Sequence, residues 1–246
     1  DTPAVKFVKG GKFKVEPTGF LAENCVTYVD GDYYVAAPMA DAMQAASEIR
    51  VSNEIDLAKV SLNGYTGTIT GVGEAAALST RNFTPSSNEA YWVNGDITFK
   101  DLDILLPTGG DWLQSGFATD NDLVFDNCDF EGQVTLNSHG NGNFTFNECD
   151  FVSTVSGKYA SFVYGADKVA FNTCSFSGVD RAAKVYGTGG DLDVVYDNCT
   201  FTSTTINKAG VEIDATYATT TVALNNGCSQ TDMNGLFNLE GTLGTV

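Results

Sequence analysis

A six-residue motif recurs along this 246-residue chain and restricts the folds open to it. An aromatic residue is followed, after two intervening residues, by a cysteine, and after one more by a phenylalanine. Four copies are nearly identical, and their first aromatic residues are 21, 25 and 25 positions apart. These copies occupy residues 125–130, 146–151, 171–176 and 196–201. A weaker fifth copy with one inserted residue lies at 224–228, residues 99–104 fit with leucine replacing cysteine, and residues 62–65 and 8–13 fit more loosely.

Each copy predicts two short strands joined by a bend. The residues before the first aromatic alternate in polarity as a strand does, for example from Asp122 to Phe125. Asparagine and aspartate tolerate the left-handed backbone conformation, so we expect the bend at the Asx that follows the aromatic. This Asx is Asp126, Asn147, Asn172, Asp197 or Asn225. The cysteine and the second aromatic are two positions apart, so both side chains point to one face of the next strand.

Three inward side chains in each copy predict one coil of a parallel β-helix, whose coils stack at about 4.8 Å and supply one another's hydrogen bonds. We therefore predict an all-β fold, a parallel β-helix solenoid with coils of about 21–28 residues. A leucine-rich repeat would need a leucine framework that is absent here. An antiparallel sandwich would contain many two-residue turn sequences between its strands, and this chain has only one strong sequence of that kind.

That hairpin signal precedes the only clear helical pattern in the sequence. Asp30-Gly31 separates two β-rich runs, a composition typical of a type I′ hairpin. Residues 38–47 place apolar side chains at helical spacing after Pro38, which suits a first helical position. We expect this short helix to cover the N-terminal end of the β-helix, because an uncapped end exposes apolar surface and strand edges. The predicted division is an N-terminal strand and hairpin segment, 1–37, and a parallel β-helix domain, 38–246.

The cysteine-centred coils resemble the pectin-lyase-like right-handed β-helices of adhesin-like surface proteins from gut bacteria and methanogens. Residues 8–35 look like the closing segment of one such unit, and residues 38–64 look like the helix and first coils of the next. The resemblance covers most of the chain and consists of a structural repeat. It implies a right-handed coil and an extracellular or cell-surface location more strongly than any activity. Such proteins are often long and modular, so we expect this chain, which opens without methionine, to be part of a longer protein.

The charge of the chain excludes some partners. It carries 31 acidic and 13 basic side chains, for a net charge of −18, so no basic stripe could neutralise nucleic-acid phosphates. Anionic membranes and anionic polysaccharides are disfavoured for the same reason. No apolar run approaches the roughly 20 residues that span a bilayer. Charged residues make up only 18%, and Gly, Thr, Ser and Asn replace them, which favours strands and turns over helices.

The cysteines of the repeat are predicted to be free. Cys128, Cys149, Cys174 and Cys199 share one repeat position and should form a stacked column in the core. Neighbouring coils lie about 4.8 Å apart, whereas disulfides place their Cβ atoms about 3.8 Å apart. We therefore expect reduced, buried thiols, with Cys25 outside the column.

Candidate polar sites are few. Three acidic pairs at i, i+2 point to one face each: Asp101 and Asp103, Asp120 and Asp122, and Asp191 and Asp193. Their nearest basic residues in the repeat are Lys158, Lys168, Arg181 and Lys184, and the lone His139 reads as a loop residue. Solubilising turns are the simplest interpretation of the acids, and no catalytic residues are predicted. Weak Ca²⁺ binding by Asp120, Asp122, Asp191 and Asp193 is the one cofactor hypothesis that the pattern allows.

Aromatic residues outside the inward positions suggest a surface for carbohydrate. Trp92, Trp112, Tyr159, Tyr164, Tyr186 and Tyr217 lie in the segments that connect the motif copies. Such rings can stack on sugars while neighbouring Asn, Asp and Thr donate or accept hydrogen bonds. The alternative is that they pack loops against the wall of the solenoid.

Two functions follow as expectations. The first is a non-catalytic extracellular or cell-surface module, adhesin-like, whose long face binds a polysaccharide or a surface protein. The second is a polysaccharide lyase or glycoside hydrolase acting on a plant or host glycan, which needs carboxylates and a base converging on one outer groove.

Overall fold

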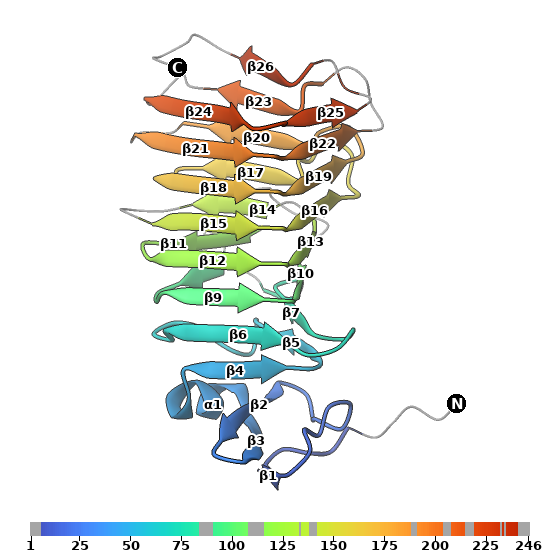
Figure 1. The fold of residues 1–246 in the computed structure, drawn as a ribbon, viewed down its shortest axis with the longest axis vertical. Coiled ribbons are helices and arrows are strands. Elements are labelled where there is room, and N and C mark those ends of the chain that lie inside the picture. Colours follow the sequence, from blue (N-terminus) through green and yellow to red (C-terminus); the bar gives the residue numbers. More distant parts are fainter. Residues whose placement is uncertain are drawn as a thin grey trace, which may run out of the picture.

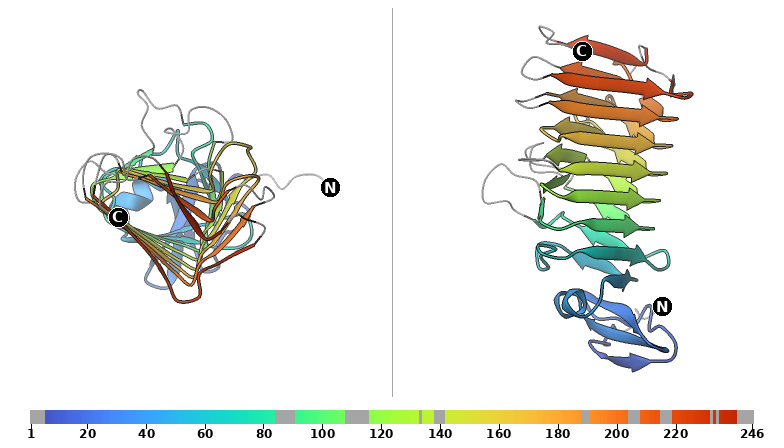
Figure 2. Two further views of the ribbon diagram at one scale, coloured as in Figure 1. Left: turned by 90° about the horizontal axis from the view of Figure 1, so that it is seen from above. Right: turned by 60° about the vertical axis from the view of Figure 1, so that its left-hand side comes forward.

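The strands of this chain stack into a β-solenoid of about six turns (Figure 1). The computed structural model describes residues 6–83, 91–107, 116–132, 134–137, 142–187, 191–203, 208–214, 219–231, 233 and 235–240. Within them, the strands form three sheets of 11, 8 and 7 strands, one along each side of the coil (Figure 2). In Figure 1 the chain runs from left to right across the near sheet and returns behind it while rising toward the C-terminus, so the coils are right-handed. The predicted fold class is confirmed.

The first sheet contains the strands that end at the first aromatic of each motif. Its parallel part comprises β4 (Glu48–Val51), β6 (Gly67–Gly71), β9 (Ile97–Lys100), β12 (Asp122–Asp126), β15 (Asn143–Asn147), β18 (Lys168–Asn172), β21 (Leu192–Asp197) and β24 (Thr220–Asn225). The second sheet contains the strands that follow the bend. It comprises β5 (Glu54–Asp56), β7 (Ala77–Ser79), β10 (Asp103–Leu105), β13 (Asp129–Glu131), β16 (Asp150–Ser153), β19 (Ser175–Gly178), β22 (Thr200–Ser203) and β25 (Ser229–Thr231).

The third sheet closes each coil on the side that the motif does not describe. It comprises β8 (Tyr91–Val93), β11 (Gly116–Thr119), β14 (Val134–Asn137), β17 (Ser161–Tyr164), β20 (Ala183–Tyr186), β23 (Val211–Asp214) and β26 (Phe237–Glu240). Every pairing between consecutive coils, from β4 onward, is parallel. Backbone groups of each coil are thus satisfied by the coils above and below, as the repeat requires.

Two columns of aromatic rings fill the core. In the first column Phe125, Phe146, Phe171 and Tyr196 pair in register, and successive rings lie 4.8–5.0 Å apart and within 8–13° of parallel. In the second column Phe130, Phe151, Phe176 and Phe201 stack at 4.6–5.1 Å. The columns meet edge to face, for example at 5.3 Å between Phe146 and Phe151. All eight rings are buried and belong to the single hydrophobic core of the coils.

The cysteines form a third column beside the rings. All six cysteines are free, which confirms the prediction for the four motif positions, and those four are buried. Three of the motif thiols donate to the carbonyl oxygen of the aromatic residue one coil earlier. Cys149 Sγ lies 3.4 Å from Phe125 O, Cys174 Sγ 3.5 Å from Phe146 O and Cys199 Sγ 3.4 Å from Phe171 O. The adjacent thiol of Cys149 and burial raise the pKa of Cys128 above its ordinary value.

The bend lies one residue later than the sequence predicts. The left-handed residues are Asp101, Asn127, Glu148, Thr173, Asn198 and Asn226, with φ between 40° and 57°. The preceding Asx residues instead form a ladder on the outer surface. Asn147 Nδ2 donates to Asp126 Oδ1 at 2.6 Å, and Asn172 Nδ2 donates to Asn147 Oδ1 at 2.8 Å. The Asx side chains therefore form hydrogen bonds between coils, and the residue after each of them adopts the left-handed backbone conformation.

The N-terminal hairpin also differs by one residue from the prediction. Strands β2 (Cys25–Asp30) and β3 (Tyr33–Pro38) pair antiparallel, with Asp30 opposite Tyr33. The loop residues are therefore Gly31 and Asp32, and only Gly31 has a positive φ, of 60°. A single positive φ at the first loop position is typical of a type II′ turn, which favours glycine there. The predicted type I′ turn with Asp30 in the loop is wrong.

The predicted helix is present as α1 (Met39–Ala45), within the expected range 38–47. Met39 and Ala42 are fully buried and belong to the same core as the coils. The helix lies at the N-terminal end of the solenoid beside β4, and the hairpin continues the first sheet in the order β1-β3-β2-β4, where β1 is Gly11–Phe13 (Figure 1). The predicted boundary between residues 37 and 38 stays a prediction.

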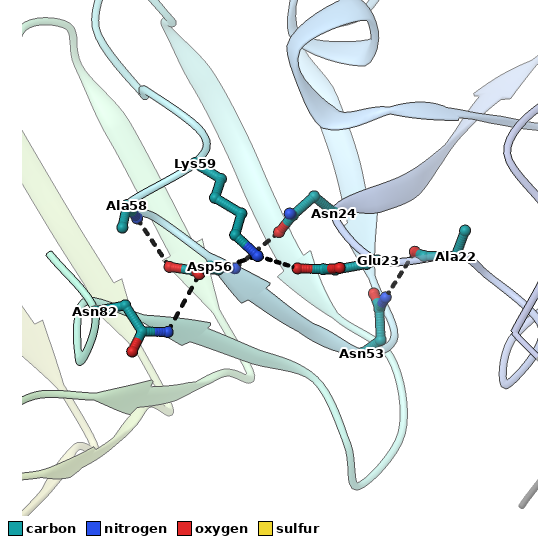
Figure 3. A network of polar contacts seen from close by, with 8 residues as sticks. All are labelled: Ala22, Glu23, Asn24, Asn53, Asp56, Ala58, Lys59 and Asn82. Atoms are coloured by element: carbon teal, nitrogen blue, oxygen red, sulfur yellow. Dashed lines mark hydrogen bonds and ion pairs between the residues drawn. The ribbon is translucent and has the colours of Figure 1, made fainter.

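Side chains fasten the N-terminal segment to the first coil. Asn24 Oδ1 accepts a hydrogen bond from Asp56 N at 2.9 Å, Asn53 Nδ2 donates to Ala22 O at 3.2 Å, and Lys59 contacts Glu23 (Figure 3). Nearby, the Arg50 guanidinium holds both carboxylate oxygens of Glu16 at 2.9 Å. Burial opposes ionisation, but hydrogen bonds from Arg50 and Thr27 hold the pKa of Glu16 below its ordinary value.

Tyr196 is the one tyrosine in the first aromatic column, and it differs from the phenylalanines there by its hydroxyl group. The ring is fully buried, and the hydroxyl oxygen has no hydrogen-bond partner. An unsatisfied buried hydroxyl costs about 1–3 kcal/mol. We predict that Tyr196→Phe raises the free energy of unfolding by about 1 kcal/mol, whereas the reciprocal Phe171→Tyr lowers it by a similar amount. Urea unfolding followed by circular dichroism measures both, and a loss of stability in Tyr196→Phe would contradict the prediction.

Thr173 is a β-branched residue at the left-handed bend, with φ of 57°. This conformation costs a β-branched residue about 1–2 kcal/mol, and asparagine adopts it more readily. We predict that Thr173→Asn raises the free energy of unfolding by about 1 kcal/mol, as measured by urea unfolding. Asn198 occupies the same position one coil later, with φ of 55°, so Asn198→Thr is the matched reverse and should lower stability. Effects of the same sign for the two changes would count against a conformational origin.

Candidate functional site

The outer face of the third sheet gathers the aromatic residues that the sequence nominates. Trp92 pairs in register with Ala118 on the next coil, and Tyr164 pairs with Tyr186, which pairs in turn with Asp214. Strand β14 joins these two groups, since it pairs with β11 on one side and β17 on the other. Alternation along the strands places this column outward, because Val163 and Val185 on the neighbouring positions are buried in the core.

Tyr164 and Tyr186 form a parallel pair on this face. Their ring centroids are 5.7 Å apart and their planes differ by 9°. Phe162 lies within 6.2 Å of Tyr164 and 6.4 Å of Tyr186, and is itself buried. Both tyrosines are partly exposed, as is Trp92. The pair is therefore an aromatic surface flanked by Phe162, with both rings partly exposed.

Tyr159 has a different role from the one considered for it. Its side chain is only 7% exposed, and its hydroxyl donates to the carboxylate of Glu212, which is itself 1% exposed. Lys208 Nζ lies 2.9 Å from the other oxygen of that carboxylate. The Arg181 guanidinium lies 5.1 Å from the ring centroid of Tyr159. Tyr159 thus packs a connecting segment against the wall, beside Phe162, and does not present its ring to solvent.

This buried cluster shows what sequence reasoning missed. Glu212 is 53 residues from Tyr159 in the sequence, and no motif near Glu212 marks it as a partner of this tyrosine. Its position on β23, directly in register with Lys184 on β20, could have been found only by aligning the third strands of successive coils. Trp112 and Tyr217, and likewise His139, lie outside the described residues.

A second candidate lies on the outer face of the first sheet. An open groove of about 470 Å³ runs across β12, β15, β18 and β21, with Val124, Thr145, Ala170 and Val195 among its lining residues. Asp122, Asn143, Lys168 and Asp193 form one side in a single register column. A neighbouring depression of about 420 Å³ shares Lys168 and Asp193 and adds Asp167 and Asp191. The groove can accept an extended ligand along the coils and offers it one ammonium and several carboxylates.

The acids nominated for Ca²⁺ are spread over different coils. Asp122 on β12 and Asp193 on β21 are three strand spacings apart, about 14 Å. Asp122 Oδ1 instead accepts a hydrogen bond from Asn143 Nδ2 at 2.7 Å. Asp120 lies beyond the end of β11 and Asp191 just before β21. Among the described residues, no group of three or more His, Cys, Asp or Glu side chains is placed to hold a metal ion.

The basic residues are equally dispersed. Lys168 borders the groove on the first sheet, whereas Lys184 is 7% exposed on the third sheet and Arg181 packs on Tyr159. Lys158 precedes Tyr159 in the same connecting segment. Of the four basic residues considered from the sequence, the structure therefore brings only Lys168 together with predicted acidic residues, namely Asp122, Asp191 and Asp193.

Comparisons with models of protein families, with curated proteins and with solved structures found no match to this chain. Across the described residues, no helix has the length and apolar character needed to cross a membrane. The site is therefore argued from its own geometry.

An acidic column on the second sheet, of which the sequence nominated only Asp103, offers a test of the register. Asp103, Asp129 and Asp150 occupy the same repeat position and pair directly on β10, β13 and β16. Burial, with the flanking carboxylates of Asp150 and Asp103, raises the pKa of Asp129 above its ordinary value. Because the pKa is higher in the folded state, protonated Asp129 stabilises the fold at acid pH. This contribution to the free energy of unfolding is lost as the pH rises through the folded-state pKa.

We predict that Asp129→Asn raises the free energy of unfolding at pH 7 by about 0.5 kcal/mol, because it removes repulsion between directly opposed charges. The gain should shrink near pH 3, where all three carboxyl groups are largely protonated. Unfolding by urea at the two pH values measures the difference. Asp32→Asn, at the exposed hairpin loop, is the control and should change stability at neither pH. A gain that is equal at both pH values would contradict the argument.

Proposed function

We propose that this chain is a non-catalytic, pectin-lyase-like β-helix module of an extracellular or cell-surface protein, and that it binds glycan in an adhesin-like role. The observation that carries the proposal is the convergence of Trp92, Tyr164 and Tyr186 on the outer column of one sheet. These residues come from three different coils and are far apart in the sequence. Their alignment along the solenoid axis suits a ligand that is itself long and repetitive.

The chemistry of the face supports carbohydrate over other ligands. The partly exposed rings of Tyr164 and Tyr186 can pack on the C–H faces of a sugar, and their hydroxyl groups can hydrogen-bond to sugar hydroxyls. Phe162 packs beside the two tyrosines and against Tyr159, which contacts the buried Glu212, and this packing limits the side-chain entropy that is lost on binding. Neutral glycans fit the net charge of −18 better than acidic ones.

A second candidate function is cleavage of a polysaccharide in the groove of the first sheet. Its support is Lys168, which lies between Asn143 and Asp193 in the register column and makes no ion pair with a described residue. An ammonium group beside carboxylates can stabilise negative charge that develops on a sugar while a carboxylate accepts the proton. Release of new reducing or unsaturated ends from a panel of plant and host polysaccharides, and its loss in Lys168→Ala, would favour this function.

Binding to a panel of neutral and acidic polysaccharides, by affinity electrophoresis and then calorimetry, tests the proposal. We predict that Tyr164→Ala and Tyr186→Ala each weaken the binding of the recognised glycan about tenfold, since an aromatic contact contributes up to about 1.5 kcal/mol. Tyr33→Ala is the matched control, because Tyr33 is a 39% exposed tyrosine of the remote hairpin. Binding that survives both changes, or that Tyr33→Ala weakens equally, would place the glycan elsewhere.

A further inference from the structure

The groove on the first sheet has a floor of small side chains. The groove of about 470 Å³ and the neighbouring depression of about 420 Å³ share Lys168 and Asp193, and Figure 1 shows their strands stacked along one side of the solenoid. Four side chains line the floor in direct register and are partly buried, namely Val124, Thr145, Ala170 and Val195. None of them is charged or longer than valine, so they form a shallow aliphatic strip along the solenoid axis.

Polar side chains border this strip on both sides. Two positions before the floor residues lies the register column of Asp122, Asn143, Lys168 and Asp193. Two positions after them lies the ladder of Asp126, Asn147, Asn172 and Asp197. Alternation along each strand points all three columns to the same face of the sheet. The floor therefore offers apolar contact to a flat ligand, and both edges offer it hydrogen-bonding groups.

The charge of the lining residues selects the sign of that ligand. Four carboxylates and one ammonium line the groove and the depression: Asp122, Asp167, Asp191, Asp193 and Lys168. None of these four carboxylates forms an ion pair with another described residue. The whole chain carries a net charge of −18, so its field adds to the local one. A cationic ligand is therefore attracted to the groove, and an anionic one is repelled.

A glycan with free amino groups matches both the floor and the charge. The C–H face of a sugar ring packs on aliphatic side chains, while hydroxyl and ammonium groups at its rim reach polar edges. A pyranose ring with its linkage is about as long as one coil is high, so successive rings meet the same floor on successive coils. Side chains on one face of an extended basic peptide recur about every 6.7 Å, out of step with coils about 4.8 Å apart.

We infer that this groove binds an amine-bearing glycan, with its rings on the floor and its ammonium groups beside Asp191 and Asp193. The site lies on the first sheet, whereas the aromatic column lies on the third. The inference therefore goes beyond the proposed function and does not rest on it. It also gives Lys168 a defined effect, since its ammonium group opposes the binding of a cation.

Calorimetry with the full chain at pH 6 tests the inference, with a β-1,4-linked glucosamine hexamer as the probe. Aspartates of ordinary pKa, about 3.9, are ionised at this pH, and the sugar amines are protonated. We expect the hexamer to bind at least about tenfold more tightly than the N-acetylglucosamine hexamer, which lacks the charge. Hexalysine should bind more weakly than the glucosamine hexamer, because it lacks rings to cover the floor.

Paired variants locate the site. Asp191→Asn with Asp193→Asn should weaken binding of the glucosamine hexamer at least about tenfold. Asp32→Asn with Asp41→Asn removes two exposed carboxylates from the N-terminal hairpin and α1, so it changes the net charge equally and is the matched control. The control should change the affinity less than about twofold. Thermal melts of each variant check that folding is unchanged.

Two further variants separate the floor from the charge. Lys168→Ala should tighten binding of the hexamer about threefold, a gain that misfolding cannot produce. Ala170→Gln places a longer, uncharged side chain across the floor and should weaken it. No binding of the hexamer, equal binding of its N-acetylated form or of hexalysine, or equal loss in the matched control overturns the inference. Weaker binding in Lys168→Ala, or loss of binding in Tyr186→Ala, overturns it as well, because the sugar would then lie elsewhere.

Discussion

In-register stacking of one coil on the next is the interaction on which the rest of this structure depends. Once Phe125, Phe146 and Phe171 share a register, their rings stack within about 5 Å and the thiols beside them must follow the same spacing. Outward positions then form columns too, whether these are the Asx ladder, the carboxylates of the second sheet or the tyrosines of the third. The same rule that fills the core therefore builds every surface of the wall.

The inward positions could be predicted from the sequence because the same apolar residue types recur at the same positions of each motif copy. Each motif copy carries the same three core side chains, and a one-residue error in register would move them all to the outside. The bend was predicted one residue too early, because the Asx residue that suggested it lies next to the residue that adopts the left-handed conformation. Asn147 serves the ladder, and Glu148 takes the left-handed conformation although its type does not favour it.

The third sheet was harder to foresee, since its strands carry no motif. The sequence nominated Trp92, Tyr164 and Tyr186 as outward aromatics, and the register brings them into one column. It could not separate them from Tyr159, whose burial depends on Glu212 two coils later. A carboxylate so distant in the chain becomes a neighbour only when the coils are stacked.

Distances between spin labels along one outward column test the stacking most directly. Thr68, Thr98, Val195 and Ala223 share a register column on the first sheet, through Val124, Thr145 and Ala170. In a Cys228→Ser background, cysteine labels at Thr98 and Val195 should lie four strand spacings apart, about 19 Å. Labels at Thr98 and Ala223 should lie about 24 Å apart, and at Thr68 and Ala223 about 29 Å apart. Distances by pulsed electron resonance that rise by about 4.8 Å per coil support the account. Distances that do not increase with the number of intervening coils would contradict it.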